Sequence, residues 1–245
     1  MKSIVLAALS LLSPIAAASQ EAPAKSPTVR ELIQRHLEAL GGEAALEKLT
    51  SRVTRGTATV VDRGTVGSTT IYQKAPALYL IVSEFPNYGT TRRAFDGERG
   101  WAESPDAGLA DLTGPRLVQM RRLARFDHDT QVESLYPGLT VVGQEALDGA
   151  AVWAARSVAG EASDTLYFDA ATGLLVGTAH EEPTPSGPAR FETRYGDFRA
   201  VDGVKVAFLT RIRTPRSTLE MKVDSVQHNQ PIDDSLFQRP STVQD

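Results

Sequence analysis

A change of hydrophobic period at Arg52 places the strongest limit on how this chain can fold. Before Arg52, apolar residues recur at every third or fourth position, as they do on one face of a helix. From Arg52 onward, apolar and polar residues alternate with a period near two for most of the sequence, which is typical of β-strands. The pattern therefore predicts a mainly β protein that begins with a helix.

Short turn sequences separate the expected strands. Glycine and aspartate accept the positive φ angles of tight hairpins, and strands joined in this way pair as antiparallel neighbours. The turns are Asp62-Arg63-Gly64, Asp96-Gly97, Asp148-Gly149 and Asp202-Gly203. We expect about eleven strands, which is many for a flat open sheet, so the sheet should curl.

Helical segments are expected at the N-terminus and in the middle of the chain. Thr28 and Glu31 have the spacing of a capping box, and Gly41-Gly42 ends the first helix, which a short helix over Glu43–Leu49 follows. The alternation then stops between Asp106 and Tyr136, and apolar residues return at helical spacing after Gly114-Pro115. This predicts a helical insert at about residues 114–130.

The predicted fold is α+β and mainly β, with a strongly curved antiparallel sheet whose concave face is covered by helices. An apolar helix stripe needs an apolar surface to cover, so a cleft between two apolar layers is expected. The residues expected to line this cleft are Tyr72, Tyr79, Ile81, Phe85, Trp101, Leu117, Met120 and Phe126. The alternative is that these residues are ordinary core, because one residue of register error inverts the face.

The inserted helix also has a basic side. Its arginines are Arg116, Arg121, Arg122 and Arg125. One interpretation is that they contact anionic head groups or a partner protein while the apolar side packs inward. The alternative is a solvated helix surface, which commonly carries such charges.

The first eighteen residues have the layout of a cleavable signal peptide. Lys2 precedes an uncharged apolar run over Ile4–Leu12, and Ala16-Ala17-Ala18 offers small residues for cleavage. The run is too short to span a bilayer, which needs roughly 20 apolar residues. We therefore expect export to the periplasm, with secretion as the alternative, and a flexible lead-in over residues 19–27.

Composition excludes several classes of protein. With no cysteine, the chain has no disulfide, no thiolate metal site and no cysteine nucleophile. A formal net charge of −4 argues against nucleic acid as a partner, because that partner selects a basic surface. After the leader, no apolar run approaches membrane-spanning length, so no transmembrane segment is expected in the mature chain.

Motifs for catalysis are absent from the sequence. It has no G-x-S-x-G, H-E-x-x-H, P-loop or G-x-G-x-x-G motif, so we expect no catalytic residues and no cofactor. The densest group of titratable residues is Asp127-His128-Asp129 with Glu133. It leaves a metal-dependent hydrolase as a remote alternative. The competing interpretation is a solvated helix end, and we expect no metal site.

Several short segments resemble those of one family of exported proteins, the LolA-like group. They are His36-Leu37-Glu38-Ala39-Leu40-Gly41-Gly42 with Ala45-Leu46-Glu47-Lys48-Leu49, the hairpin Phe95–Trp101, the turn Tyr167–Leu174 and the ending Ile232–Pro240. The resemblance covers nearly the whole mature chain in the right order. It implies a single domain over residues 28–240 with a short tail over 241–245, built as a half-open β-barrel with helices over a hydrophobic cavity.

The resemblance also implies a function. Members of the group carry lipids or lipoproteins through the periplasm, or sense them in regulatory domains. We therefore expect a non-enzymatic carrier or binder of lipid or lipoprotein acyl chains, with an inner- or outer-membrane envelope protein as a further partner. The alternative is a sensor or interaction module of the same fold with no lipid cargo.

Overall fold

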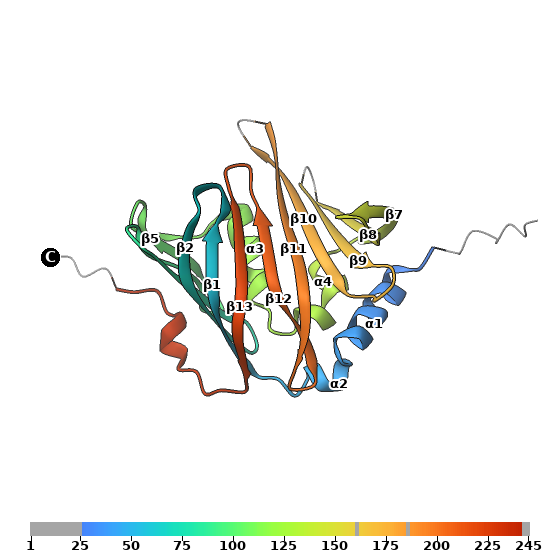
Figure 1. Ribbon diagram of the computed structural model, residues 1–245, viewed down its shortest axis with the longest axis horizontal. Helices are drawn as coiled ribbons and strands as arrows, with labels where there is room; N and C mark the ends of the chain where they lie inside the picture. The colour runs from blue at the N-terminus through green and yellow to red at the C-terminus, as the bar shows by residue number, and fades with distance from the viewer. Residues whose placement is uncertain (1–25, 160–161, 185–186, 242–245) are drawn as a thin grey trace, which may run out of the picture.

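The structure is a computed structural model that describes residues 26–159, 162–184 and 187–241. The signal peptide predicted from the sequence lies outside these residues. A single sheet of thirteen strands, paired antiparallel throughout, dominates the fold (Figure 1). The strands are β1 Ser51–Val60, β2 Thr65–Lys74, β3 Leu78–Phe85, β4 Gly89–Phe95, β5 Gly100–Ser104, β6 Gly108–Asp111, β7 Thr140–Leu147, β8 Ala150–Ala159, β9 Ala162–Asp169, β10 Leu175–Thr184, β11 Gly187–Val201, β12 Val204–Arg213 and β13 Thr218–His228.

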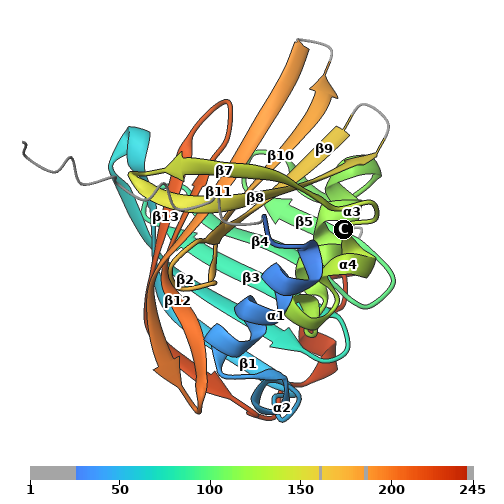
Figure 2. The same ribbon diagram turned by 90° about the vertical axis from the view of Figure 1, so that its right-hand side faces the viewer.

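The sheet consists of two meanders that meet in its middle. β1 to β6 run outward to one edge, β7 begins at the opposite edge, and β7 to β13 return until β13 pairs with β1. The segment after β6 must therefore cross from one edge to the other. Because the sheet curls, this crossing takes place over its concave side (Figure 2). The prediction of a curved antiparallel sheet is confirmed.

Two features of the sheet differ from the sequence prediction of about eleven strands. β6 forms where no alternation is visible, because it is a short edge strand held by its pairing with β5, from Trp101↔Asp111 to Ser104↔Gly108. A proline-rich stretch normally indicates a loop, but Pro183 and Pro188 stand in register between β10 and β11. In the described residues neither proline interrupts a second ladder, because β9 pairs with β10 only as far as Glu181, and β12 pairs with β11 only from Glu192 onward.

The helices lie on the concave side, which we call the inner face. They are α1 Val29–Leu40, α2 Glu43–Leu46, α3 Gly114–Ala124 and α4 Val132–Leu135. The 3₁₀ turns are η1 Val61–Arg63, η2 His128–Thr130 and η3 Asp234–Phe237, of which η3 lies on the opposite face of the sheet. The capping box is present, since the Glu31 N–H donates to Thr28 Oγ1 at 3.2 Å and the Thr28 N–H to Glu31 Oε2 at 2.7 Å. α2 ends earlier than the predicted Leu49.

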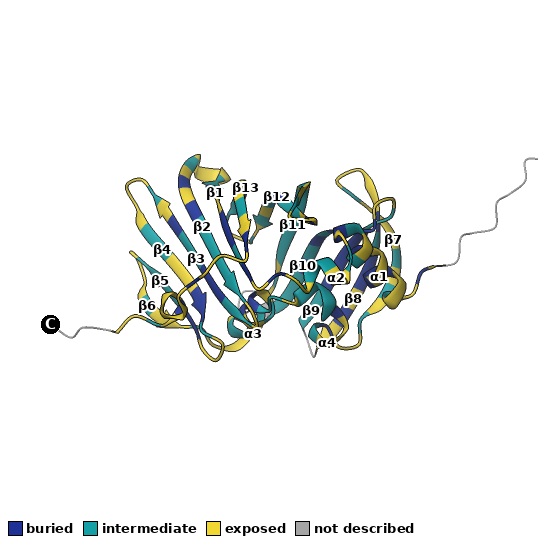
Figure 3. Ribbon diagram, turned by 90° about the horizontal axis from the view of Figure 1, so that it is seen from below, coloured by how far each residue is buried: buried dark blue, intermediate teal, exposed yellow. Residues whose placement is uncertain are grey.

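The apolar core is divided among clusters on the two faces of the sheet. On the inner face, α1 and α4 pack on β8, β9 and β10 through Leu32, Val132 and Phe168, and α3 packs on β3 and β4. On the opposite, outer face, the C-terminal segment covers β1 to β5. Figure 3 shows buried positions concentrated in two regions, on β3 to β5 and under α1, with mostly half-buried strands between them. No helix in the described part of the chain is long and apolar enough to cross a membrane.

Candidate functional site

The inner face under α3 brings together four of the residues predicted to line a cleft. Tyr79 and Met120 are buried, and Ile81 and Leu117 are partly buried against them. Burial raises the pKa of Tyr79 to about 12, so its hydroxyl stays protonated. The strand and the helix meet through side chains at alternate positions on β3 and at helical spacing on α3, as the sequence pattern requires.

Two other predicted residues lie next to this layer. Phe85 belongs to the same alternating set on β3 and is half-buried. Phe126 follows α3, and its backbone N–H donates to the Pro76 carbonyl at 3.0 Å, which holds it beside the β2–β3 turn. Its ring centroid is 6.0 Å from Cζ of Arg52.

Tyr72 and Trp101 lie on the outer face, away from α3. Trp101 is buried in a cluster with Phe237 and Ile232, and Tyr72 packs against the same cluster. The Trp101 indole N–H donates to the Phe237 carbonyl at 2.9 Å. The predicted lining is therefore split between two faces, because strand alternation alone does not show which face a C-terminal segment will cover.

The centre of the inner face is lined by aliphatic side chains that are only half-buried. Val226 and Val223 stand opposite Thr54 and Gly56 of β1, and Leu219 stands opposite Ile212 of β12. Among the described residues, none of these four aliphatic side chains belongs to the hydrophobic clusters that the helices complete. The inner face thus keeps accessible apolar surface between its two covered ends.

An ion pair joins α3 to the opposite wall of the sheet. Arg122 Nη1 donates to Asp164 Oδ2 of β9 at 2.6 Å, and the Arg122 guanidinium lies 4.7 Å from the ring centroid of Tyr136. Asp164 Oδ1 is 2.8 Å from His180 Nδ1. Burial alone would raise the pKa of Asp164, but the hydrogen bonds from His180 and Arg122 lower it. We call Arg122, Asp164 and His180 the α3 anchor.

The remaining arginines of α3 face different surroundings. Arg116 and Arg121 are exposed. Arg125 pairs with Asp127, with Nε 2.7 Å from Oδ1. Of the four arginines predicted to contact head groups or a partner, two are therefore engaged in ion pairs within the chain and two are open to solvent.

The acidic group around residue 129 is divided among separate partners. Asp127 pairs with Arg125, whereas Asp129 Oδ1 lies 3.3 Å from His36 Nε2 and 3.6 Å from His128 Nδ1. Burial would raise the pKa of Asp129, but the bonds to His128 and His36 hold it well below its usual range. No three ligands in the described ranges are arranged to hold a metal ion.

His36 is a structural residue of the inner face. Its side chain is 3% exposed, and its Nδ1 accepts a hydrogen bond from the Leu175 N–H at 3.1 Å. Nε2 therefore carries the proton toward Asp129. The sequence shows His36 on the apolar stripe of α1, and the structure shows it fastening α1 both to β10 and to the segment after α3.

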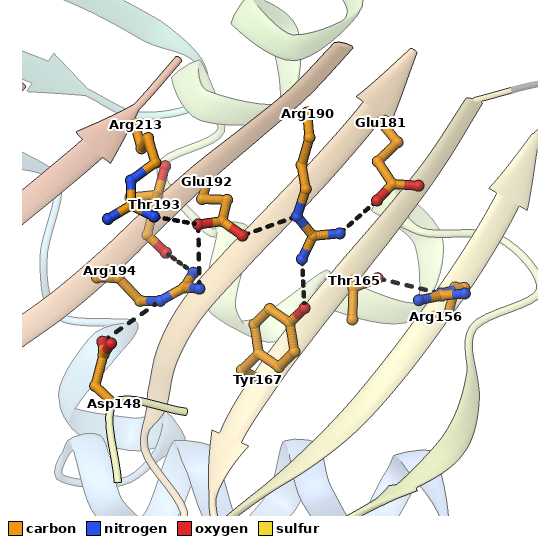
Figure 4. Close-up of polar contacts among 10 residues, drawn as sticks. All are labelled: Asp148, Arg156, Thr165, Tyr167, Glu181, Arg190, Glu192, Thr193, Arg194 and Arg213. Atoms are coloured by element: carbon orange, nitrogen blue, oxygen red, sulfur yellow. Dashed lines mark hydrogen bonds and ion pairs between the residues drawn. The ribbon is translucent and has the colours of Figure 1, made fainter. Parts of the chain in front are cut away.

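Sequence reasoning missed a charged network on the outer face, shown in Figure 4. Glu192 is surrounded by three arginines: Arg190 Nε at 2.8 Å, Arg194 Nη2 at 3.4 Å and Arg213 Nη1 at 3.8 Å (Figure 4). Burial would raise the pKa of Glu192, but these arginines lower it. Arg190, Glu192 and Arg194 are alternate residues of β11, so their common face could have been read from the sequence, whereas Arg213 of β12 joins them only through strand register.

Two cavities lie away from the packed residues under α3. One of about 430 Å³ opens where β12 and β13 separate, because they pair only from Leu209↔Lys222 to Arg213↔Thr218. Charged residues, including Asp197 and Arg199, contribute to its lining. The other, of about 210 Å³, lies between α1 and η2. Neither has the apolar lining that was predicted for the cleft.

Comparison with known proteins identifies the fold. No protein-family model matches the chain, and no curated protein sequence matches it. Many solved structures are similar to it, and the following are among them. A DUF1329 family protein from Desulfovibrio piger has a TM-score of 0.58 at 12% identity, over 86% of this chain and 97% of the other. A LolA superfamily protein from Nitrosomonas europaea has a TM-score of 0.54 at 10% identity, over 87% and 98%.

A further similar structure is that of a putative outer-membrane lipoprotein-sorting protein domain from Vibrio parahaemolyticus. It has a TM-score of 0.51 at 8% identity and covers 84% of this chain and 97% of that one. These likenesses extend over nearly the whole of each protein. They confirm that the chain has a LolA-like fold.

Proposed function

We propose that this protein is a periplasmic, non-enzymatic binder or carrier of acyl chains from lipids or lipoproteins. The observation that carries the proposal is the half-buried aliphatic lining of the inner face, which continues from Ile81, partly covered by α3, to Val223 and Val226 of β13, which no helix cluster of the described residues covers. Burying a CH₂ group gives about 0.8 kcal/mol, so a chain of roughly 15 carbons gains on the order of 12 kcal/mol. An uncovered apolar surface inside a curved sheet fits such a ligand.

The periplasmic setting is supported by the signal-peptide pattern at the N-terminus and by the LolA-like fold. The Vibrio parahaemolyticus domain, which shares this fold, is a putative outer-membrane lipoprotein-sorting protein. The exposed Arg116 and Arg121 of α3 are available to meet anionic head groups or an envelope protein while Met120 faces the sheet.

A polar substitution at Ile81 tests the assignment of the inner face. We expect Ile81→Asp to weaken binding of the neutral fluorescent probe 1-N-phenylnaphthylamine by about tenfold or more, because a carboxylate would be placed against the apolar probe. Fluorescence titration of delipidated protein measures the affinity, and circular dichroism with urea unfolding establishes that the variant is folded.

Val66→Asp is the matched control. Val66 lies on the adjacent strand β2 but is 52% exposed, so the same charge added there should leave probe binding unchanged. Equal probe affinity in folded Ile81→Asp and Val66→Asp would contradict the assignment. Failure of the wild-type protein to bind either the probe or any acyl-chain lipid would contradict the proposed function itself.

A further inference from the structure

Arg52 is a cation on the inner face that has no acidic partner close by. It is the second residue of β1, and its register partner on β13 is His228. Arg52 Nε donates to His228 Nε2 at 3.1 Å. In the described part of the chain, no carboxylate oxygen lies within 4.0 Å of its guanidinium.

The hydrogen bonds of His228 fix the direction of Arg52. Because Nε2 accepts from Arg52, the proton of the neutral ring sits on Nδ1, which donates to Asp202 Oδ2 at 3.0 Å. The side chain of His228 is 1% exposed, so this arrangement is held rigidly. Desolvation lowers the pKa of His228, and the charge of Arg52 lowers it further, whereas Asp202 raises it. The net effect is a lowered pKa, which keeps the ring neutral.

This arrangement occupies Nε of Arg52 and leaves both Nη groups without a protein acceptor in the described residues. Two parallel Nη–H donors match the two oxygens of a carboxylate or phosphate. Desolvation also lowers the pKa of Arg52, whereas the negative charge of Asp129, which is not in contact with it, raises that pKa. Asp129 is itself bonded to His36 and His128. Arg52 is half-buried, and a partly desolvated arginine without a paired anion is unfavourable, so an oxyanion would offset that cost.

The rows of the sheet next to Arg52 change from polar to apolar. Across the inner face, Gln73, Arg52 and His228 form one row. The next row consists of Ile71, Thr54 and Val226, and the one after it includes Val223. Val60, at the far end of β1, is about 27 Å from Arg52 at the usual rise per residue. A charged end and an apolar track thus lie on one continuous surface.

We propose that Arg52 binds the oxyanion of an amphiphile, a carboxylate or phosphate, whose acyl chain lies along the inner face of β1 and β13. The proposal rests on the proposed function and adds the class of ligand: an acyl chain that ends in an anionic group. His228 and Asp202 are positioning residues, since they orient Arg52 and are themselves occupied.

The test compares palmitate with hexadecan-1-ol, which has the same chain but no charge. Competition against 1-N-phenylnaphthylamine on the delipidated mature chain gives both affinities. We expect the wild-type protein to bind palmitate about tenfold or more tightly than hexadecan-1-ol. Arg52→Gln should lose this preference and bind hexadecan-1-ol as the wild type does. Palmitoyl lysophosphatidate, tested alongside, shows whether the Arg52-dependent preference is greater for phosphate or for carboxylate.

Arg55→Gln is the matched control. Arg55 lies on the same strand, is exposed on the outer face, and donates to Gln227 of β13 at 2.9 Å. It should keep the full preference for palmitate. Equal affinity of the wild type for palmitate and hexadecan-1-ol would overturn the anion site but not the proposed binding of acyl chains. This result does not depend on whether Arg52→Gln folds. A preference retained in Arg52→Gln would also overturn the anion site. If the wild type binds none of the three amphiphiles, the proposed function itself is contradicted, and the anion site with it.

Discussion

Trp101 and Phe237 show how single side chains join β5 to the C-terminal segment. Phe237 is fully buried and Trp101 is 2% exposed, and one indole N–H···O=C bond of 2.9 Å links them. Lys74 adds a contact to the same segment through the Ile232 carbonyl at 2.9 Å. Without the C-terminal segment, the outer face of β1 to β5 would expose an apolar cluster. The turn η3 covers this cluster, as the helices cover the inner face.

We predict that Phe237→Ala lowers the free energy of unfolding by about 3–5 kcal/mol, because it leaves a cavity beside Trp101. Urea unfolding followed by tryptophan fluorescence measures the change. Leu236→Ala is the control: Leu236 is adjacent but 46% exposed, so its truncation should cost at most about 0.5 kcal/mol. Similar losses in the two variants would show that η3 does not seal the outer face.

Among the elements, α3 is held to the sheet by apolar packing on one side and by the α3 anchor on the other. The hydrogen bond to Asp164 raises the pKa of His180, against desolvation. His180 Nε2 and Glu182 Oε2 are 3.5 Å apart, and both atoms are buried without a hydrogen-bond partner in the described structure. A proton on Nε2 of His180 would face Glu182, so the protonated ring suits this site.

The anchor makes stability depend on pH. A histidine whose folded pKa is raised stabilises the protein fully below its unfolded pKa of about 6.5, and this contribution is lost as pH rises through the folded value. We predict that the free energy of unfolding of wild type minus that of His180→Gln decreases from about pH 5 to about pH 8. We compare the two proteins because the lowered pKa of His228 makes stability increase with pH in both of them. This contribution cancels in the difference. A difference that is constant or increases with pH would refute the anchor.

Across the molecule as a whole, the sheet curls without closing. Its edges, β6 and β7, are the two ends of the strand order, and the connection through α3 and α4 spans them. The covered parts of the inner face lie under α3 and under α1, and the half-buried strands β11 to β13 lie between them (Figure 3). A ligand on those strands would complete the core instead of occupying a preformed closed cavity.

Native mass spectrometry of the protein, purified gently from the periplasm without detergent, tests this arrangement. We predict a discrete added mass that extracts into organic solvent and fragments as a molecule with an acyl chain. Delipidated protein should recover an adduct of the same class after incubation with a membrane lipid extract. A bare protein mass both before and after that incubation would count against a lipid carrier and favour a module that binds an envelope protein.

Much of the fold could be predicted from local physics. The capping box at Thr28, the hairpin turns at Asp62, Asp96, Asp148 and Asp202, and the helix after Gly114 depend on side chains within a few residues of each other. The alternation of apolar residues identified most strands for the same reason. A curled sheet followed from their number, and the meeting of Tyr79 with Met120 followed from their apolar stripes.

The site itself depended on contacts between residues distant in sequence. Trp101 lies on the outer face because Phe237 covers it, and Arg52 gains its orientation from His228, 176 residues later. The sequence placed Arg52 at the start of an expected strand, which shows neither the face on which it lies nor whether an acid lies opposite. Elements and turns could thus be predicted from the residue order, since the interactions that form them are short-range. Which face is inner, and which charge stays unpaired, was settled only by the folded arrangement, since strand register and the covering of a face are long-range.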